Sequence, residues 1–333
     1  MRLRTVSPDQ PGIRRLRRGR GFGYVHASGR AVSAAERRRI EELVIPPAWT
    51  DVWICELANG HIQAVGTDDA GRRQYLYHPV WRERRDRDKF EHALTVGQRL
   101  PVARSVVTRH LKLPGMPAER ALATAFRLLD LGFFRIGGES YTEQHGSYGL
   151  ATLLRRHVSV RGGVATFRYA AKSGQRRDLT LQDAQTIAAV RAMLARKGGG
   201  NELLAYRRGR VWVDVTSSDI NAYVKERLGE DVSAKDFRTW HATVLAALEL
   251  ASRSAEATSR TARQRVEREA VREVAERLGN TRTVARNSYI DPQVIESFRR
   301  GQTVDCAFTA AEVVGSPRRR AVAERALLRL LSG

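Results

Sequence analysis

Residues 52–78, VWICELANGHIQAVGTDDAGRRQYLYH, contain three short runs rich in β-branched and aromatic residues, separated by two turn signals. Asn59-Gly60 stands between the first two runs, and the stretch 68–71, Asp-Asp-Ala-Gly, stands between the last two. Asn-Gly between apolar runs is a strong indication of a β-hairpin. The stretch therefore predicts a small antiparallel sheet made from the runs VWICEL, HIQAVG and RQYLYH.

The pattern changes on both sides of the predicted sheet. On the N-terminal side, residues 33–43 are typical of a helix that ends before Pro46-Pro47. The first 20 residues hold seven Arg and few apolar groups, which indicates a mobile basic arm. On the C-terminal side, residues 118–130 and 266–278 repeat apolar side chains close to the 3.6-residue period of a helix. A strand-turn-strand is predicted at 163–182.

The fold class predicted from these patterns is α+β, with a small β-rich N-terminal domain and a larger, mainly α-helical domain. We expect the boundary between them near residues 90–100. The predicted segments are a basic arm at 1–20, the β-rich domain at 21–92, the helical domain at 93–310 and a basic C-terminal helix at 311–333.

Charge is the strongest global feature of the chain. Lys and Arg number 58 and Asp and Glu number 36, a net charge of +22, and the excess is present on both sides of residue 90. A polyanion held by the whole body of the protein, meaning nucleic acid, is favoured over a basic tail. Only six of the basic residues are Lys, so a retained Lys is more often one that chemistry requires.

Several classes of enzyme and location are disfavoured by missing patterns. Around Lys172, the sequence lacks the glycines of a phosphate-binding loop. The eight His residues are scattered, and Cys55 and Cys306 are the only cysteines, so no zinc spacing is present. No apolar stretch is long enough for a membrane span, and the basic start lacks the apolar run of a signal peptide. We expect no metal, no cofactor and a cytoplasmic location on the nucleoid.

Four stretches in the second part of the chain carry cations, an amide and a tyrosine. They are FFRIGGESY with Arg135, FRYAAKSGQ with Lys172, KDFRTWHATV with Arg238, and LGNTRTVARNSYIDP with Asn280 and Tyr289. In this order they resemble the catalytic residues of type IB DNA topoisomerases, specifically the small poxviral and bacterial branch. RIGGESYTEQHGSYGLATLLRRHV resembles the segment around the first catalytic arginine of this family. IPPAWTDVWIC and GHIQAVGTDDAGRRQYLYHPVWRERRDRDKF resemble its β-rich cap domain, and the resemblance covers most of residues 22–300.

The resemblance implies a catalytic role for each of these residues. Tyr289 would attack a phosphodiester and form a covalent intermediate, which stores the bond energy so that religation needs no ATP. Arg135 and Arg238 would bind the non-bridging oxygens of the transition state with paired N–H groups. Lys172 would give a proton to the departing 5′-oxygen, which Arg cannot readily do because its pKa exceeds about 12.

Asn280 departs from part of the family pattern. The poxviral and eukaryotic enzymes have His in its place, whereas bacterial relatives resemble this chain in having Asn. An amide can donate an N–H to a phosphoryl oxygen but cannot shuttle protons. We therefore expect Asn280 to act as a hydrogen-bond donor.

In the cap domain, the resemblance places the strand that carries Gln74, Tyr75 and Tyr77 in the major groove of DNA. Arg72 and Arg73 precede it and would hold phosphates. By strand alternation, Tyr75 and Tyr77 share one face and Gln74 points to the other. Aromatic packing in a core is the alternative interpretation of the two tyrosines.

Two other functions remain alternatives. Tyrosine recombinases share this chemistry, but they typically have His three residues before the second arginine, where this chain has Lys235, and a helical N-terminal domain. A catalytically inactive architectural protein would keep the charge without needing the cations and Tyr289 together. The favoured hypothesis is a monomeric enzyme that relaxes duplex DNA through a 3′-phosphotyrosyl intermediate, with no small-molecule substrate and no membrane partner.

Overall fold

The computed structural model describes residues 1–138, 142, 146–314 and 316–332. It divides the chain into two compact units, Met1–Lys89 and Phe90–Gly333, close to the predicted domain boundary at residue 92. The predicted fold class, a β-rich domain followed by a mainly helical one, is confirmed. Parts of the motif that follows Arg135, at 139–141 and 143–145, lie outside the described residues.

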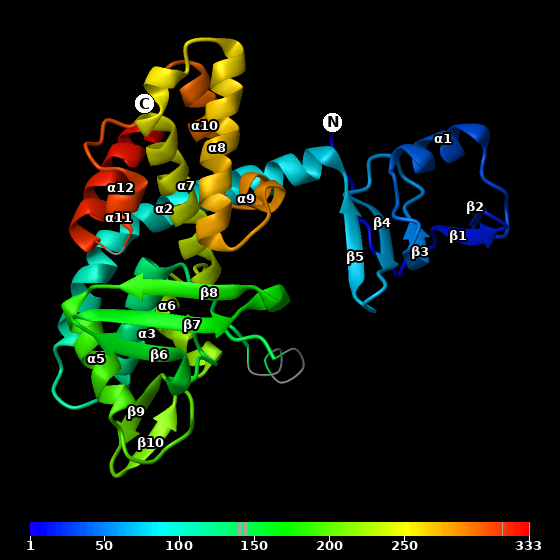
Figure 1. Ribbon diagram of the computed structural model, residues 1–333. Helices are drawn as coiled ribbons and strands as arrows, with labels where there is room; N and C mark the ends of the chain where they lie inside the picture. The colour runs from blue at the N-terminus through cyan, green and yellow to red at the C-terminus, as the bar shows by residue number, and fades with distance from the viewer. Residues whose placement is uncertain (139–141, 143–145, 315, 333) are drawn as a thin grey trace. The chain divides into compact units, whose positions relative to one another are not determined.

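The first unit is a five-stranded antiparallel sheet in the order β2-β1-β3-β4-β5, with one helix (Figure 1). Its elements are β1 (Ile13–Arg18), β2 (Gly21–His26), α1 (Ala34–Glu42), β3 (Thr50–Ile54), β4 (Ile62–Thr67) and β5 (Arg73–Tyr77). The predicted three-stranded sheet is confirmed as β3, β4 and β5. Ser33 begins α1 by a capping box with Glu36, which satisfies main-chain N–H groups at the helix start.

The prediction of a basic arm at residues 1–20 is wrong. Ile13–Arg18 form β1, whose first residue Ile13 is fully buried in the core of this unit. Arg15 lies on the same face of the strand and donates hydrogen bonds to main-chain carbonyls between Ile45 and Trp49. The sequence of β1 is rich in arginine, so it lacks the apolar residues that would predict a strand. On the inner face, hydrogen bonds from Arg15 to carbonyls take the place of apolar packing. Composition alone could not reveal this.

The second unit contains two small antiparallel sheets at one end, with helices such as α3 and α5 behind the three-stranded sheet (Figure 1). The three-stranded sheet consists of β6 (Val158–Arg161), β7 (Val164–Ala170) and β8 (Arg176–Leu181), and the two-stranded sheet of β9 (Ala205–Arg208) and β10 (Val211–Asp214). The helices are α3 (Ala118–Gly132), α5 (Ala184–Leu194), α6 (Ser217–Leu228), α7 (Ala234–Ser252), α8 (Arg260–Leu278), α9 (Arg282–Ser288), α10 (Pro292–Arg299), α11 (Ala310–Val313) and α12 (Pro317–Ser332). Helix α2 (Pro79–Leu111) begins before the division between the units and ends after it. Short 3₁₀ turns lie at Arg155–His157, Lys172–Gly174 and Ser254–Glu256.

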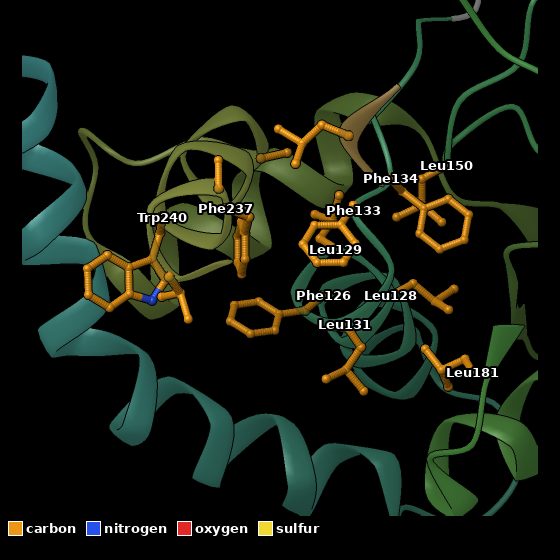
Figure 2. Packing of buried hydrophobic residues seen from close by; sticks show 14 of the residues in the cluster. Phe126, Leu128, Leu129, Leu131, Phe133, Phe134, Leu150, Leu181, Phe237 and Trp240 are labelled. Carbon is orange, nitrogen blue, oxygen red and sulfur yellow. The ribbon is translucent and has the colours of Figure 1, made fainter. Parts of the chain in front are cut away.

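Helix α7 is the centre of the second unit. It packs against α3, α6, α8, α10 and α12, and its residues from Phe237 to Leu250 are all buried. Figure 2 shows Phe237 and Trp240 of α7 facing the side chains of α3, including Phe126, Leu129 and Leu131. The Trp240 ring packs directly on Gly97 of α2, where a Cβ atom would overlap the ring. This packing fixes the position of α7, which carries Arg238.

The basic helix predicted within residues 311–333 is α12, and it is an integral part of this unit. Helix α12 packs against α7, and Ala323, Ala326 and Leu327 are buried. Its Glu324 accepts hydrogen bonds from Arg104 at 2.5 and 2.8 Å and from the Trp240 indole at 3.0 Å. The helix is amphipathic, and its apolar face is covered by the core. Among the described residues, no helix has both the length and the apolar character needed to cross a membrane.

Candidate active site

The C-terminal end of helix α8 gathers two of the predicted cations. The last carbonyls of a helix have no partner inside the helix and lie at the negative end of its dipole. Here the chain turns at Gly279 with φ of 62°, a left-handed conformation that favours glycine. Arg238 donates to the carbonyl of Leu278 at 2.9 Å, and Arg135 donates to that of Gly279 at 2.8 Å. Main-chain dipoles thus hold two like charges in one place.

Arg238 is almost completely buried, with 3% of its surface exposed. It also donates to the carbonyl of Phe133 at 2.8 Å, so both terminal nitrogens are fixed. Burial lowers the pKa of Arg238 to about 10 and the charge of Arg135 lowers it too, whereas Tyr289 opposes both effects. The group stays charged at neutral pH. Its Nε is buried and has no hydrogen-bond partner among the described residues.

Arg135 is positioned by the end of α3. Phe133, the C-cap residue of this helix, has φ of 56°, and Phe134 then stacks on Tyr169 of β7. Arg135 donates to Oδ1 of Asn280 at 2.6 Å. This bond orients the amide so that its other end, Nδ2, is buried without a partner in the described part of the chain. Asn280 therefore presents a free N–H donor beside a fixed guanidinium.

Tyr289 lies against Arg238. It is the C-cap residue of α9, and its carbonyl accepts a hydrogen bond from Thr243 of α7 at 3.2 Å. The guanidinium carbon of Arg238 is 5.2 Å from the centre of the tyrosine ring, which is a cation–π contact. The phenol thus lies beside a buried cation at the end of α8.

Lys172 is exposed in the 3₁₀ turn between β7 and β8. It shares a pocket of about 180 Å³ with Arg135, and the walls of this pocket are completed by Gly137, Gly138, Ser147, Tyr148 and Gly149. The structure therefore brings together Arg135, Arg238, Asn280 and Tyr289 around the end of α8, with Lys172 on a pocket that Arg135 also lines.

Positive charge in this site is not balanced by acidic side chains. In the described part of the chain, neither Arg135 nor Arg238 forms an ion pair with a carboxylate; both are held by uncharged oxygens. Uncompensated guanidiniums, a free amide donor and a phenol suit a phosphate ester, whose oxygens need N–H donors during attack by an oxyanion.

The predicted groove-contacting residues of the first unit divide into two sets. Tyr75 and Tyr77 are 40% and 39% exposed and stack on one another, with ring centres 6.0 Å apart, and Arg73 lies on the same exposed face. This confirms the predicted alternation and contradicts the alternative of core packing. Gln74 points to the other face and donates to Asp68 at 2.9 Å, and Arg72 forms an ion pair with the same carboxylate. Hydrogen bonds from Arg72 lower the pKa of Asp68 to about 2.

Three residues that support the site were missed by sequence reasoning: Tyr169, Thr243 and Arg177, which donates to main-chain carbonyls at the end of α8. Arg177 is one of many arginines, and only its pairing with Tyr169 across β7 and β8 distinguishes it. Strand alternation from the buried Tyr169 would have assigned Arg177 to the inner face, had the register of the hairpin been known. Thr243 carries no sequence signal, because its role is a contact with a main-chain carbonyl.

Comparison with known proteins gives a family match over most of the second unit. Residues 78–303 match the family model described as the catalytic core of eukaryotic DNA topoisomerase I. The chain belongs to the type IB DNA topoisomerase family. It is a DNA topoisomerase, and DNA is its substrate. Residues 21–68 match the N-terminal domain of bacterial DNA topoisomerase IB.

One curated relative from this family is DNA topoisomerase 1B of Acanthamoeba polyphaga mimivirus. It is 28% identical over 303 residues, which cover 86% of this chain and 88% of the relative. A solved structure of the XerH site-specific recombinase, bound to its palindromic difH substrate, is also similar. It has a TM-score of 0.36 and 14% identity, over 69% of this chain and 58% of the recombinase chain.

Proposed function

We propose that this topoisomerase relaxes supercoiled duplex DNA by cutting one strand, allowing the duplex to rotate and resealing the break. Tyr289 attacks the scissile phosphate, forms a 3′-phosphotyrosyl bond and releases a 5′-hydroxyl, which later attacks back. The observation that carries this proposal is the contact between Tyr289 and the buried, uncompensated Arg238 at the end of α8.

The transition state gathers negative charge on the non-bridging oxygens of the phosphate. Arg135 and Arg238 bind these oxygens, and the unpartnered Nδ2 of Asn280 donates a further hydrogen bond. Because all three are fixed by protein contacts before DNA arrives, little reorganisation is needed during the reaction. Lys172 protonates the departing 5′-oxygen, since an ammonium releases a proton far more readily than a guanidinium.

Contacts with the DNA outside the scissile phosphate come from β5. Tyr75 and Tyr77 face base edges in the major groove, and Arg73 holds the adjacent backbone. In this structure Gln74 and Arg72 are bonded to Asp68, so they reach DNA only if those bonds are exchanged. One chain carries the full set of five site residues, so we propose that a monomer suffices. Neither ATP nor a metal ion is required.

Plasmid relaxation in EDTA without ATP tests the function. We expect both positively and negatively supercoiled plasmids to relax, and Tyr289→Phe to bind DNA normally but form no covalent adduct. An absolute requirement for Mg²⁺ or ATP would refute the proposal. An adduct formed by Tyr289→Phe would show that the nucleophile is a different residue.

End-labelled duplexes separate the alternative functions. A topoisomerase leaves the protein on the 3′-end of the cut strand and relaxes a plasmid that has no partner site. A recombinase forms the same adduct but exchanges strands between two copies of a specific site. An architectural protein forms no adduct at all.

A further inference from the structure

A third arginine, Arg177 of β8, is bound to the same end of helix α8. It donates to the carbonyl of Arg277 at 2.5 Å and to that of Glu276 at 3.3 Å. The carbonyls of residues 276–279 are thus all occupied by arginine side chains, because Arg238 and Arg135 bind the next two. Arg177 comes from the hairpin that carries Lys172, whereas Arg238 comes from α7.

The contact between this hairpin and the helix end is close. A Cβ atom at Gly279 would lie 2.8 Å from Nη1 of Arg177 and 3.0 Å from Oε1 of Gln175. Glycine at this position therefore serves two purposes: it turns the chain with positive φ, and it admits the hairpin. Arg177 also lies directly opposite Tyr169 across the two strands.

Lys172 lies only a few residues from this contact. The main-chain bond from Ala171 to the carbonyl of Gln175, 2.8 Å long, closes the turn that carries Lys172. The β8 side of the turn is therefore tied to the end of α8 through Arg177, two residues beyond Gln175. The position of the Lys172 ammonium relative to Asn280 and Arg135 depends on this tie.

The tie has an electrostatic cost. Burial lowers the pKa of Arg177, and the positive charge of Arg135 lowers it too. A neutral side chain would avoid the repulsion from Arg135, and an exposed arginine would avoid the burial. A guanidinium can, however, bridge two carbonyls of a helix end at once, because its donors form a planar fork.

We propose that Arg177 is a positioning residue that holds the Lys172 turn against the end of α8, so that Lys172 reaches the departing 5′-oxygen. The proposal rests on the proposed function and specifies how its proton donor is held. A misplacement of about 1 Å can slow a catalysed step by on the order of 10²-fold. Loss of Arg177 therefore acts mainly on proton transfer.

A duplex with sulfur in place of the 5′-bridging oxygen isolates this step. The thiolate is a good leaving group and needs no proton, so a variant that lacks only proton delivery recovers on this substrate. The substrate is built at a cleavage site mapped with the unmodified protein. Single-turnover adduct formation is measured for Arg177→Met, which keeps the apolar stem, for Arg177→Lys, which keeps the charge, and for Lys172→Ala.

We expect Arg177→Met to cleave ordinary DNA at least 10-fold more slowly, with unchanged DNA affinity, and to recover most of that rate on the sulfur substrate, as Lys172→Ala does. Arg177→Lys should be intermediate. The matched control is Arg176→Met, which removes the exposed neighbour on the other face of β8 and should leave both rates unchanged.

Three results would overturn the proposal. The first is a normal rate for Arg177→Met on ordinary DNA. The second is an equal defect on both substrates, which would mean that Arg177 acts through Asn280 and Arg135 or on folding alone. The third is a Lys172→Ala defect that sulfur does not relieve, since Lys172 would then not be the proton donor. Failure of the unmodified protein to form any adduct would instead refute the proposed function itself.

Discussion

At the scale of single residues, the site is built from arginines that are held by carbonyl oxygens rather than by carboxylates. Arg238 and Arg135 keep their full positive charge for the substrate, because their partners at the end of α8 carry only partial charges. A carboxylate partner would neutralise each cation and compete with the phosphate. The arrangement is therefore suited to binding an anion that arrives from solution.

The first prediction concerns these two arginines. Arg135→Ala and Arg238→Ala should each slow single-turnover cleavage by about 10²-fold or more, the scale for losing one preorganised donor to a transition state. DNA affinity should change little, since many other basic residues hold the backbone. Arg286→Ala removes an exposed arginine from α9 near Tyr289 and serves as the control. If affinity fell in proportion to rate, the two residues would be ordinary backbone contacts.

The second prediction concerns the free amide of Asn280. Asn280→His should remain active, because an imidazole can also present an N–H to the phosphate. Asn280→Ala should be slower than both, since it loses the donor and the acceptor that Arg135 uses. Cleavage rates under single-turnover conditions make the comparison. Equal rates for Asn280→Ala and the unmodified protein would exclude Asn280 from the site.

At the scale of elements, the hairpin of β1 and β2 extends beyond the sheet that supports it. Only Ile13 and Arg14 of β1 pair with β3, whereas the whole of β1 pairs with β2. Its far end carries Arg17, Arg18 and Arg20, which are exposed and form no ion pair with a carboxylate in the described part of the chain. Elsewhere in this unit, Arg37 and Arg72 do have such partners.

The third prediction follows from this unbalanced charge. Replacing Arg17, Arg18 and Arg20 together by Gln should weaken DNA binding and reduce the slope of log affinity against log salt, by up to about 3 if each one contacts a phosphate. Arg37→Gln should leave the slope unchanged. Affinity would be measured at several salt concentrations. An unchanged slope with poorer solubility would mean that the arginines only protect an edge strand from aggregation.

At the scale of the whole molecule, a buried network behind the site joins α2, α3, α7 and α12. Arg104 forms an ion pair with Asp130 at 2.7 Å and one with Glu324 at 2.5 Å, and His241 lies 3.5 Å from Asp130. Arg320 donates to His241 at 3.2 Å and stands over the Phe133 ring, whose own carbonyl binds Arg238. The last helix thus supports the site through Phe133.

The fourth prediction is a loss of stability in mild acid. Burial lowers the pKa of His241 to about 4, the charge of Arg320 lowers it too, and Asp130 opposes both effects. As pH falls below about 6.5, His241 binds a proton in the unfolded chain, whereas in the folded chain it stays neutral down to about pH 4. The free energy of unfolding should therefore fall across this window, by up to about 3 kcal/mol for this group.

Urea unfolding between pH 7 and pH 4 measures the effect. His241→Gln keeps an acceptor for Arg320 but cannot titrate, so its stability should fall less steeply between pH 6.5 and 4. The Asp130 carboxylate titrates in a lower window, because its pKa is held well below the usual range by Arg104 despite complete burial. Parallel pH profiles for the variant and the unmodified protein would contradict a neutral His241.

The sequence by itself determined the fold class and the sheet of β3, β4 and β5, and it predicted, through a family resemblance, that five residues share one candidate site. Turn chemistry and helical periodicity are local properties, so they can be read from neighbouring residues. The order of four short motifs is also a property of the sequence alone, which is why the family resemblance could be recognised. These features depend on residue type and spacing alone.

Tertiary structure alone decided how that site is held together. Arg135, Arg177 and Arg238 are far apart in the chain. They converge beside Asn280 because unpaired carbonyls at the end of one helix attract guanidiniums. Nothing in the sequence around Arg177 distinguishes it from other arginines, and β1 is concealed because Arg15 bonds to carbonyls where an apolar side chain is expected. Every residue has a main-chain carbonyl, so residue types do not indicate which carbonyls will accept hydrogen bonds from arginine. These contacts can be identified only in the folded structure.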